Sequence, residues 1–328
     1  MRAFLTALFL LASPAMAECN GQNLLDQMPE SERREIFDRA EAEPFATGNF
    51  WTASKGSQSV VLIGTYHLGD PRHDHTMAAI TPLIDRAKTV LVEAGPEEER
   101  ALVGHLAKHP DLMVLTDTSL PELLTPEDWD SLSSAMQLRG IPGFMAAKFQ
   151  PWYVSLLLAT PPCDMNNVMA KAGLDAQIID RAKDKSIPIR ALEPFDSVFK
   201  IFDKLPMADQ VDMIRYSLGM EDRVEDFAAT LADAYFNGDS RVIWELMRHE
   251  SMGTPGVSLE ELEAKLALMG EAMMHSRNRE WISVIEESAA QGPTLAAFGA
   301  LHLSGSEGVA NLLKLRGWTL SPLPMPDR

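Results

Sequence analysis

The chain has 328 residues, of which 46% are hydrophobic and 23% charged, and its formal net charge at pH 7 is −18. This length and apolar content suffice for one α/β domain with a sizeable core. The acidic balance excludes nucleic acid and anionic membrane surfaces as expected partners, because both repel negative charge. The charge by itself indicates no substrate.

The first residues predict an export signal. Arg2 gives a positive start, a short apolar stretch follows, and Ala15-Met16-Ala17 provides a cleavage site of the A-x-A type. The apolar stretch is too short for a membrane span, which needs roughly 20 residues, and no other segment approaches that length. We expect residues 1–17 to be a signal peptide and residues 18–328 to be a periplasmic or secreted protein without a membrane span.

The chain has two cysteines, Cys19 and Cys163, and both lie in the expected mature protein. In an oxidising compartment an even pair predicts one disulfide. It would fasten the new N-terminus to the body of the domain and stabilise the fold by about 2–4 kcal/mol. Metal binding by the thiols is the alternative, but neither cysteine has a Cys or His neighbour at ligand spacing.

The first part of the mature chain predicts a helix followed by a βαβ unit. Pro29-Glu30-Ser31-Glu32-Arg33 is typical of a helix start. Residues 48–55 then lead into a short apolar run, Ser59 to Ile63, which indicates a buried strand. A helix over residues 77–87 and a second apolar run, Thr89 to Val92, complete the unit, with the two strands parallel.

Two long helical blocks, at about 97–174 and 195–287, separate the remaining strands, and the second block is rich in methionine. We interpret residues 18–328 as one α/β domain whose central, mixed but largely parallel sheet carries these blocks as insertions. The elements expected outside the blocks are a helix over residues 174–182, a strand over 187–192, a strand over 294–298, a helix over 308–315 and a strand over 318–323.

An imidazole or a carboxylate follows each of four predicted strands. Gly64-Thr65-Tyr66-His67 and Gly299-Ala300-Leu301-His302 follow two of them, and Glu93 and Glu193 follow the others. Ligands of open α/β sheets bind at the carboxyl ends of the strands. Neutral imidazoles and carboxylates are ligands of divalent metal ions, and glycine three positions before each histidine allows a close backbone approach.

A purely structural explanation stays open for each of these side chains. A strand-end histidine can simply hydrogen-bond a neighbouring loop, Glu93 can cap loop amides, and Glu193 can form an ion pair with Arg190 or another base. A loose metal site at His73 and His75 is a further possibility. The other histidines lie in polar or helical surroundings and are expected to be solvated: His73, His75, His105, His109, His249 and His275.

Several segments carry a resemblance to a known family. They are Ile63-Gly64-Thr65-Tyr66-His67, Val90-Leu91-Val92-Glu93-Ala94-Gly95, Gly173-Leu174-Asp175, Ala191-Leu192-Glu193, Arg277-Asn278 with Trp281, and Phe298-Gly299-Ala300-Leu301-His302-Leu303-Ser304-Gly305. In these segments the chain resembles the TraB/PrgY/GumN family, which includes the Tiki-type membrane-associated metalloproteases. The core of that family is similar to the erythromycin esterase and ChaN haem-binding folds.

The resemblance implies a metal-dependent hydrolase that acts on a peptide or protein, with Mn²⁺, Co²⁺ or Zn²⁺ as the ion. It implies His67 and His302 as ligands, with Glu93 as either the third ligand or the general base and Glu193 in the other role. Arg277 would stabilise the developing oxyanion. Asn278 is expected to cap or brace Arg277. The ion would polarise the scissile carbonyl and lower the pKa of a bound water toward about 7.

Two other classes of function stay open. One is a non-catalytic periplasmic protein that holds a peptide or a haem-like ligand, which the methionine-rich blocks suggest because thioethers suit adaptable apolar pockets. Helical periodicity favours ordinary core positions for those methionines. The other is an accessory factor in surface polysaccharide production, since the GumN branch is linked by name to such gene clusters. The sequence indicates neither the metal's identity nor the oligomeric state.

Overall fold

The structure is a computed structural model that describes residues 19–203, 205–252 and 258–323, so the predicted signal peptide, residues 1–17, lies outside it. Across the described ranges the strands form one six-stranded sheet in the order β4-β3-β5-β2-β1-β6. The neighbours β4, β3, β5 and β2 are parallel, and β1 is antiparallel to both β2 and β6. The predicted α/β class with a mixed, largely parallel sheet is therefore confirmed. The strands are β1 (Phe50–Lys55), β2 (Gln58–Thr65), β3 (Thr89–Val92), β4 (Ile189–Ala191), β5 (Thr294–Gly299) and β6 (Thr319–Pro322).

The central pair of strands, β2 and β5, comes from the two apolar runs that precede the Gly-x-x-His segments. Every residue of β5 is buried, as expected for a strand that is covered on both faces. In the register of this pair Gly64 lies opposite Phe298 and Thr65 opposite Gly299. The two Gly-x-x-His segments therefore leave the sheet side by side.

The strand β1 is a correction to the prediction, which treated residues 48–55 only as a lead-in. These residues pair antiparallel with β2, and Lys55 lies opposite Gln58 across a two-residue turn. Gly56 has a φ of 61° in that turn, a left-handed conformation that glycine adopts without strain. The hairpin was missed because Phe50-Trp51-Thr52-Ala53-Ser54-Lys55 does not alternate cleanly between apolar and polar residues.

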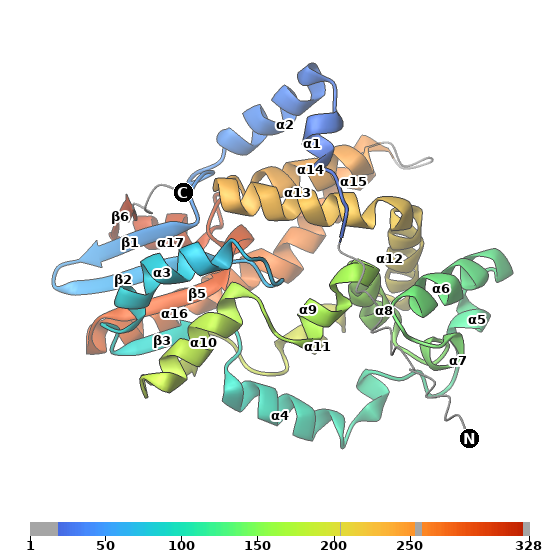
Figure 1. Cartoon of the computed structure of the whole chain (residues 1–328), viewed down its shortest axis with the longest axis horizontal. Coiled ribbons are helices and arrows are strands. Elements are labelled where there is room, and N and C mark those ends of the chain that lie inside the picture. Colours follow the sequence, from blue (N-terminus) through green and yellow to red (C-terminus); the bar gives the residue numbers. More distant parts are fainter. Residues whose placement is uncertain (1–18, 204, 253–257, 324–328) are drawn as a thin grey trace, which may run out of the picture.

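Helices cover both faces of the sheet (Figure 1). Against one face, Trp281 and Ile285 pack with Leu62 and Phe298 in one cluster of the core. The opposite face is covered by three helices from distant parts of the chain, so the sheet is buried on both sides. The helices of the first face are α16 (Ser276–Gln291) and α17 (Val309–Leu315), and those of the second are α3 (His73–Ile84), α10 (Leu174–Asp184) and α13 (Val224–Asn237).

A helical lobe lies beside the sheet, at the right of Figure 1. It has its own core of leucine and other apolar side chains, among them Leu120, Leu132, Met136 and Ile214. In the described ranges no helix is long and apolar enough to cross a membrane. The lobe contains α5 (Leu120–Leu123), α6 (Pro126–Leu138), α7 (Gly143–Ala146), α8 (Pro151–Leu158) and α12 (Met207–Gly219).

The remaining helices connect these layers or cover their edges. They are α1 (Leu24–Gln27), α2 (Glu30–Glu41), α4 (Pro96–Leu106), η1 (Pro110–Leu112), η2 (Pro162–Asp164), α9 (Met165–Met169), α11 (Ser197–Phe202), η3 (Glu221–Arg223), α14 (Val242–Ser251), α15 (Leu259–Gly270), η4 (Glu271–His275) and η5 (Ala300–His302). The predicted N-terminal helix is α2, which begins directly after Pro29.

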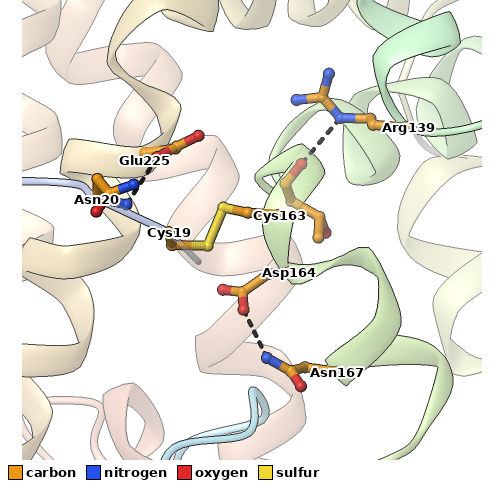
Figure 2. Close-up of a disulfide and its surroundings, with 8 residues drawn as sticks. Cys19, Asn20, Arg139, Cys163, Asp164, Asn167 and Glu225 are labelled. Carbon is orange, nitrogen blue, oxygen red and sulfur yellow. Dashed lines mark hydrogen bonds between the residues drawn. A yellow bond between two sulfur atoms is a disulfide. The ribbon is translucent and has the colours of Figure 1, made fainter. Parts of the chain in front are cut away.

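The predicted disulfide joins Cys19 to Cys163 across a sequence separation of 144 residues (Figure 2). Next to it, the backbone N–H of Asn20 donates to Glu225 at the start of α13, with a length of 3.0 Å. The backbone N–H of Gln22 donates to the neighbouring Asp226 over 2.7 Å. The N-terminal segment is thus fastened to two distant parts of the chain.

We expect reduction of the Cys19–Cys163 disulfide to lower the free energy of unfolding by about 2–5 kcal/mol, because the unfolded chain then regains the entropy of an open loop. The measurement is urea unfolding with and without a thiol reductant. A Cys19→Ser, Cys163→Ser double variant serves as the control, since its midpoint should not respond to the reductant. An equal midpoint for oxidised and reduced wild type would contradict the prediction.

Candidate functional site

The four predicted site residues at strand ends all lie at the same edge of the sheet. His67 and Glu193 each follow their strand by two residues, Glu93 follows β3 directly, and His302 ends the short helix η5 after β5. Since the four strands are parallel neighbours, their carboxyl ends form one continuous edge. The N-terminus of α16 brings Arg277 to the same edge, where it contacts both Glu93 and Glu193.

The space over Gly299 is where three of these side chains meet. A Cβ atom placed on Gly299 would lie 3.2 Å from His67 Nε2, 3.3 Å from Glu93 Oε1 and 3.7 Å from His302 Cδ2. The Gly299 backbone N–H donates to Glu93 Oε1 over 2.6 Å. The absence of a side chain at this position therefore leaves a small space bordered by two imidazoles and a carboxylate.

Asp175 orients the His67 ring. His67 Nδ1 lies 3.1 Å from Asp175 Oδ1, so Nδ1–H donates to the carboxylate and Nε2 faces the space over Gly299. Asp175 reaches the ring because the chain passes very close to it at Gly173, where a Cβ atom would lie 2.2 Å from the His67 carbonyl oxygen. Glycine is required at that approach.

The surroundings favour the protonated form of His67. Desolvation of the ring disfavours the charged imidazolium. The hydrogen bond to Asp175 and the charge of Glu93 outweigh this desolvation and raise the pKa of His67 to about 9. The side chain is 59% exposed, so burial opposes protonation only weakly and the upward direction stands. A metal ion that binds through the Nε2 lone pair of His67 must displace the proton on Nε2.

His302 is held in the opposite state. Burial, supported by the Arg277 charge, lowers the pKa of His302 to about 3, so the ring is neutral at pH 7. Its Nδ1–H donates to Asn278 Oδ1 over 2.5 Å, and the ring lies against Trp281 with 4.4 Å between ring centroids. The lone pair is therefore on Nε2. Asn278, which was expected to brace Arg277, instead fixes the tautomer of His302.

Arg277 is the cation at the centre of the cluster. Its guanidinium donates to both oxygens of Glu193, at 2.7 and 2.8 Å, and to Glu93 Oε2 at 2.7 Å. Its Nη1 donates to the Met273 carbonyl oxygen at 2.9 Å and lies 3.3 Å from His302 Nε2. Arg277 thus occupies lone pairs on two of the three side chains that border the space over Gly299.

The two carboxylates of the cluster differ in proton affinity. Burial alone would raise the pKa of Glu93, but its neighbours His302, His67 and Arg277 hold it well below its usual range. Because His302 is neutral at pH 7, the charges that act there are those of His67 and Arg277. Burial and the nearby Glu93 charge raise the pKa of Glu193 despite the ion pair with Arg277, so Glu193 is the stronger base.

A short π-helix, η4, sets the position of Arg277. It covers Glu271–His275 and runs directly into α16, whose second residue is Arg277. The wider turn is rare in proteins and is frequent at functional sites. The expected ion pair of Glu193 is formed with another base, Arg277, and not with Arg190, which pairs with Glu287 at 2.9 Å.

The side chains around Gly299 are of types that bind a divalent ion. Two imidazoles present Nε2 while Nδ1 is anchored to a carboxylate or an amide, as is usual for metal-bound histidines, and Glu93 supplies the oxygen. Among the described residues, however, no three side chains of the usual ligand types are assembled in metal-binding geometry. Arg277 lies against Glu93 and His302, so an ion would have to displace it from both.

His73 is not solvated, contrary to the prediction. It begins α3, is 0% exposed, and packs against Tyr66, Tyr235 and Phe236. Its Nε2 lies 2.9 Å from the Leu68 carbonyl oxygen. The ring therefore faces the core, which argues against the loose metal site considered as a possibility at His73 and His75.

Asp175 is the residue of the cluster to which the sequence analysis gave no role. We expect Asp175→Asn to lower the pKa of His67 from about 9 toward its ordinary value, because the variant removes the carboxylate but keeps a hydrogen-bond acceptor. The raised pKa contributes stability that is present below about pH 6.5 and is lost as the pH rises through about 9. NMR titration of the ring protons measures the shift, and an unchanged His67 titration would contradict the assignment.

Comparison with known proteins identifies the family of the chain. The family model described as the TraB/PrgY/gumN family matches residues 49–322. The chain is also similar to the uncharacterized protein YbaP of Escherichia coli (strain K12), with 21% identity over 274 residues that cover 79% of this chain and 89% of the relative. The uncharacterized protein YbaP of Shigella flexneri matches with the same identity and coverage. With the family model covering most of its length, the chain belongs to the TraB/PrgY/gumN family.

Proposed function

We propose that the protein is an exported, divalent-metal-dependent hydrolase whose site lies over Gly299. The observation that carries the proposal is the meeting of His67 Nε2, Glu93 Oε1 and the His302 ring around the position of a missing side chain. A space with that lining admits a small cation better than it admits any apolar group. The anchored Nδ1 atoms of both histidines support the same reading.

In this proposal His67, Glu93 and His302 hold the ion, which is Mn²⁺, Co²⁺ or Zn²⁺. Bound there, it would polarise a carbonyl and lower the pKa of a water molecule. Asp175 holds the His67 ring with Nε2 toward the space, and Asn278 holds the His302 ring with the Nε2 lone pair next to Arg277. Loss of the proton from His67 Nε2 precedes its use as a ligand, so binding is favoured as the pH rises.

In the proposal, Glu193 accepts a proton and Arg277 stabilises an oxyanion. Glu193 is ionised by its contact with Arg277 and made more basic by burial, which suits a group that takes the proton of an attacking water. Arg277, once displaced from Glu93 and His302, carries its charge at the same edge and stabilises an oxyanion that develops there. Trp281 Nε1 donates to Glu193 over 3.2 Å and keeps that carboxylate in place.

The substrate class in the proposal is a peptide, as the resemblance to the Tiki-type branch implies. The 59% exposure of the His67 side chain supports access by a chain-like substrate from solvent. The Cys19–Cys163 disulfide supports export to the periplasm or medium, because disulfides persist in oxidising compartments.

The test is hydrolysis of a fluorogenic peptide library by protein that has been stripped of metal and then given Mn²⁺, Co²⁺ or Zn²⁺ separately. We expect no turnover without an ion and turnover with at least one of them, because the water must be activated. Activity that is equal in the stripped and the reloaded protein would contradict a metal-dependent reaction. Binding of an ion without cleavage of any peptide would contradict the substrate class.

A further inference from the structure

Two series of contacts lead from the Cys19–Cys163 disulfide to the loop of residues 66–72, which we call the His67 loop. The first series begins at Cys163 in η2, which runs directly into α9. Asn167 of α9 donates to Asp164 over 2.9 Å and so joins the helix to the residue next to the disulfide (Figure 2). The position of α9 is therefore tied to that of the disulfide.

The residues of α9 and those directly after it lie against the His67 loop. A Cβ atom on Gly69 would lie 2.7 Å from Ala172 Cβ and 3.5 Å from Asn167 Cβ, so the two segments touch at a position without a side chain. The chain then enters α10, whose second residue, Asp175, orients the His67 ring. The first series of contacts thus ends at the partner of the proposed metal ligand.

The second series begins at Cys19 and follows the N-terminal segment along α13. The backbone N–H of Leu24 donates to the buried Thr230 over 2.8 Å. Asn23 Nδ2 donates to Asp233 Oδ2 over 3.1 Å. The disulfide therefore holds one end of a segment that contacts α13 along three of its turns.

Asp233 joins this N-terminal segment to the His67 loop. Its Oδ1 accepts from Arg72 Nη1 over 2.9 Å, while its Oδ2 accepts from Asn23. Arg72 in turn donates to Asp70 through Nε and Nη2, at 2.9 and 2.8 Å. The second series therefore reaches the loop at Asp70 and Arg72, and the first reaches it at Gly69.

We propose that formation of the Cys19–Cys163 disulfide fixes the His67 loop, so that the candidate site is fully assembled only in the oxidised protein. The disulfide joins the far ends of the two series of contacts into a closed ring that includes the loop. Without this bond the ring is open, and only packing and hydrogen bonds, for which water competes, restrain the loop. Local opening of the loop then becomes more frequent.

The redox step is a thiol–disulfide exchange. The Cys19 and Cys163 thiols lose two protons and two electrons as their sulfurs join, and the disulfide of an exported oxidoreductase takes them up and becomes two thiols. Thiols stay reduced in the cytosol and are oxidised after export. A hydrolase built in this way would have a mobile His67 loop before export and a fixed one afterwards. That consequence rests on the proposed function, whereas the coupling of disulfide and loop does not.

The experiment is hydrogen–deuterium exchange of the metal-free protein, read by mass spectrometry, with and without a phosphine reductant. In the oxidised protein the backbone N–H groups of Arg72 and His73 donate to Asp70, so they exchange only when the loop opens. We expect peptides over residues 66–73 to exchange about tenfold faster after reduction, with no change in the buried strand β5. Removal of the reductant and reoxidation should restore the slow exchange.

Two variants separate the coupling from a general loss of stability. Cys19→Ser, Cys163→Ser should exchange rapidly in the His67 loop with or without the reductant. Leu132→Ala is the matched control, because it destabilises the core of the helical lobe without touching either series of contacts. It should leave the ratio of exchange rates between the His67 loop and β5 as in oxidised wild type.

Metal affinity tests the consequence for the site. Isothermal titration with Mn²⁺ or Co²⁺ should show binding to the reduced protein that is about 10- to 100-fold weaker, as loss of a group that orients a ligand causes. Equal loop exchange in the oxidised and reduced protein, or an equal rise in β5, would overturn the coupling. Faster loop exchange with unchanged metal affinity would overturn its role in assembling the site. Absence of metal binding in the oxidised protein would contradict the proposed function, and the exchange rates would still decide the coupling.

Discussion

Alanine at both His67 and His302 is expected to abolish uptake of a divalent ion while the protein stays folded. The proposed site would then keep one of its three ligands, Glu93. Loss of a residue that only orients a ligand costs 10- to 100-fold in metal affinity, so loss of two ligands should cost more than about 100-fold. His67 is largely exposed, and His302 fills a small part of the core, so neither truncation should unfold the chain.

The measurement is metal content by plasma mass spectrometry after equilibration with Mn²⁺, Co²⁺ and Zn²⁺, followed by removal of free ions. Wild type should retain about one ion per chain, and the double variant none. A His105→Ala, His109→Ala variant is the matched control, because it also removes two neighbouring histidines, on and just beyond α4. Equal retention by wild type and the His67, His302 variant would show that the metal, if bound, is held elsewhere.

The edge of the sheet could be predicted from the sequence because its signals are local. Gly64-Thr65-Tyr66-His67 and Gly299-Ala300-Leu301-His302 each follow an apolar run, and parallel strands bring such ends together whatever the rest of the chain does. Glu93 and Glu193 follow the same logic. Predicting the positions of these residues in the fold therefore required only the assignment of the strands and of a parallel sheet.

The contacts of these residues needed more than local signals. Arg277 lies between two carboxylates because the π-helix η4 sets the phase of α16, and no short motif predicts that wider turn. Asp175 belongs to Gly173-Leu174-Asp175, one of the segments that carry the family resemblance. Its contact with His67 could not be predicted, because the two residues are 108 positions apart in the sequence. His73 was misjudged for a similar reason, since its neighbour Phe236 comes from the second helical block.

Arg277→Met is expected to have effects of opposite sign on the metal-free protein and on metal binding. Methionine keeps most of the length and apolar surface of the side chain but removes the charge. In the metal-free protein, Glu93 and Glu193 then lack their shared partner. Removing one member of a buried ion pair costs about 3–5 kcal/mol, so urea unfolding should shift to lower concentration.

The same substitution should strengthen metal binding, because Arg277 is the group that contacts Glu93 Oε2 and His302 Nε2 in the metal-free state. The ion no longer has to displace a guanidinium, and it supplies the positive charge that the two carboxylates lack. Isothermal titration with Mn²⁺ or Co²⁺ measures the affinity. Addition of the ion should also restore part of the lost stability, since binding to the folded state alone stabilises it.

Arg190→Met is the matched control for this variant, because it removes an arginine of β4 that pairs with one exposed glutamate, Glu287. It should change neither metal affinity nor, by more than about 1 kcal/mol, the free energy of unfolding. For Arg277→Met, turnover of the metal-loaded enzyme should fall by about 10²–10³ if the guanidinium stabilises an oxyanion. Weaker metal binding in that variant would contradict the prediction, because it would show that Arg277 supports the bound ion and does not compete with it.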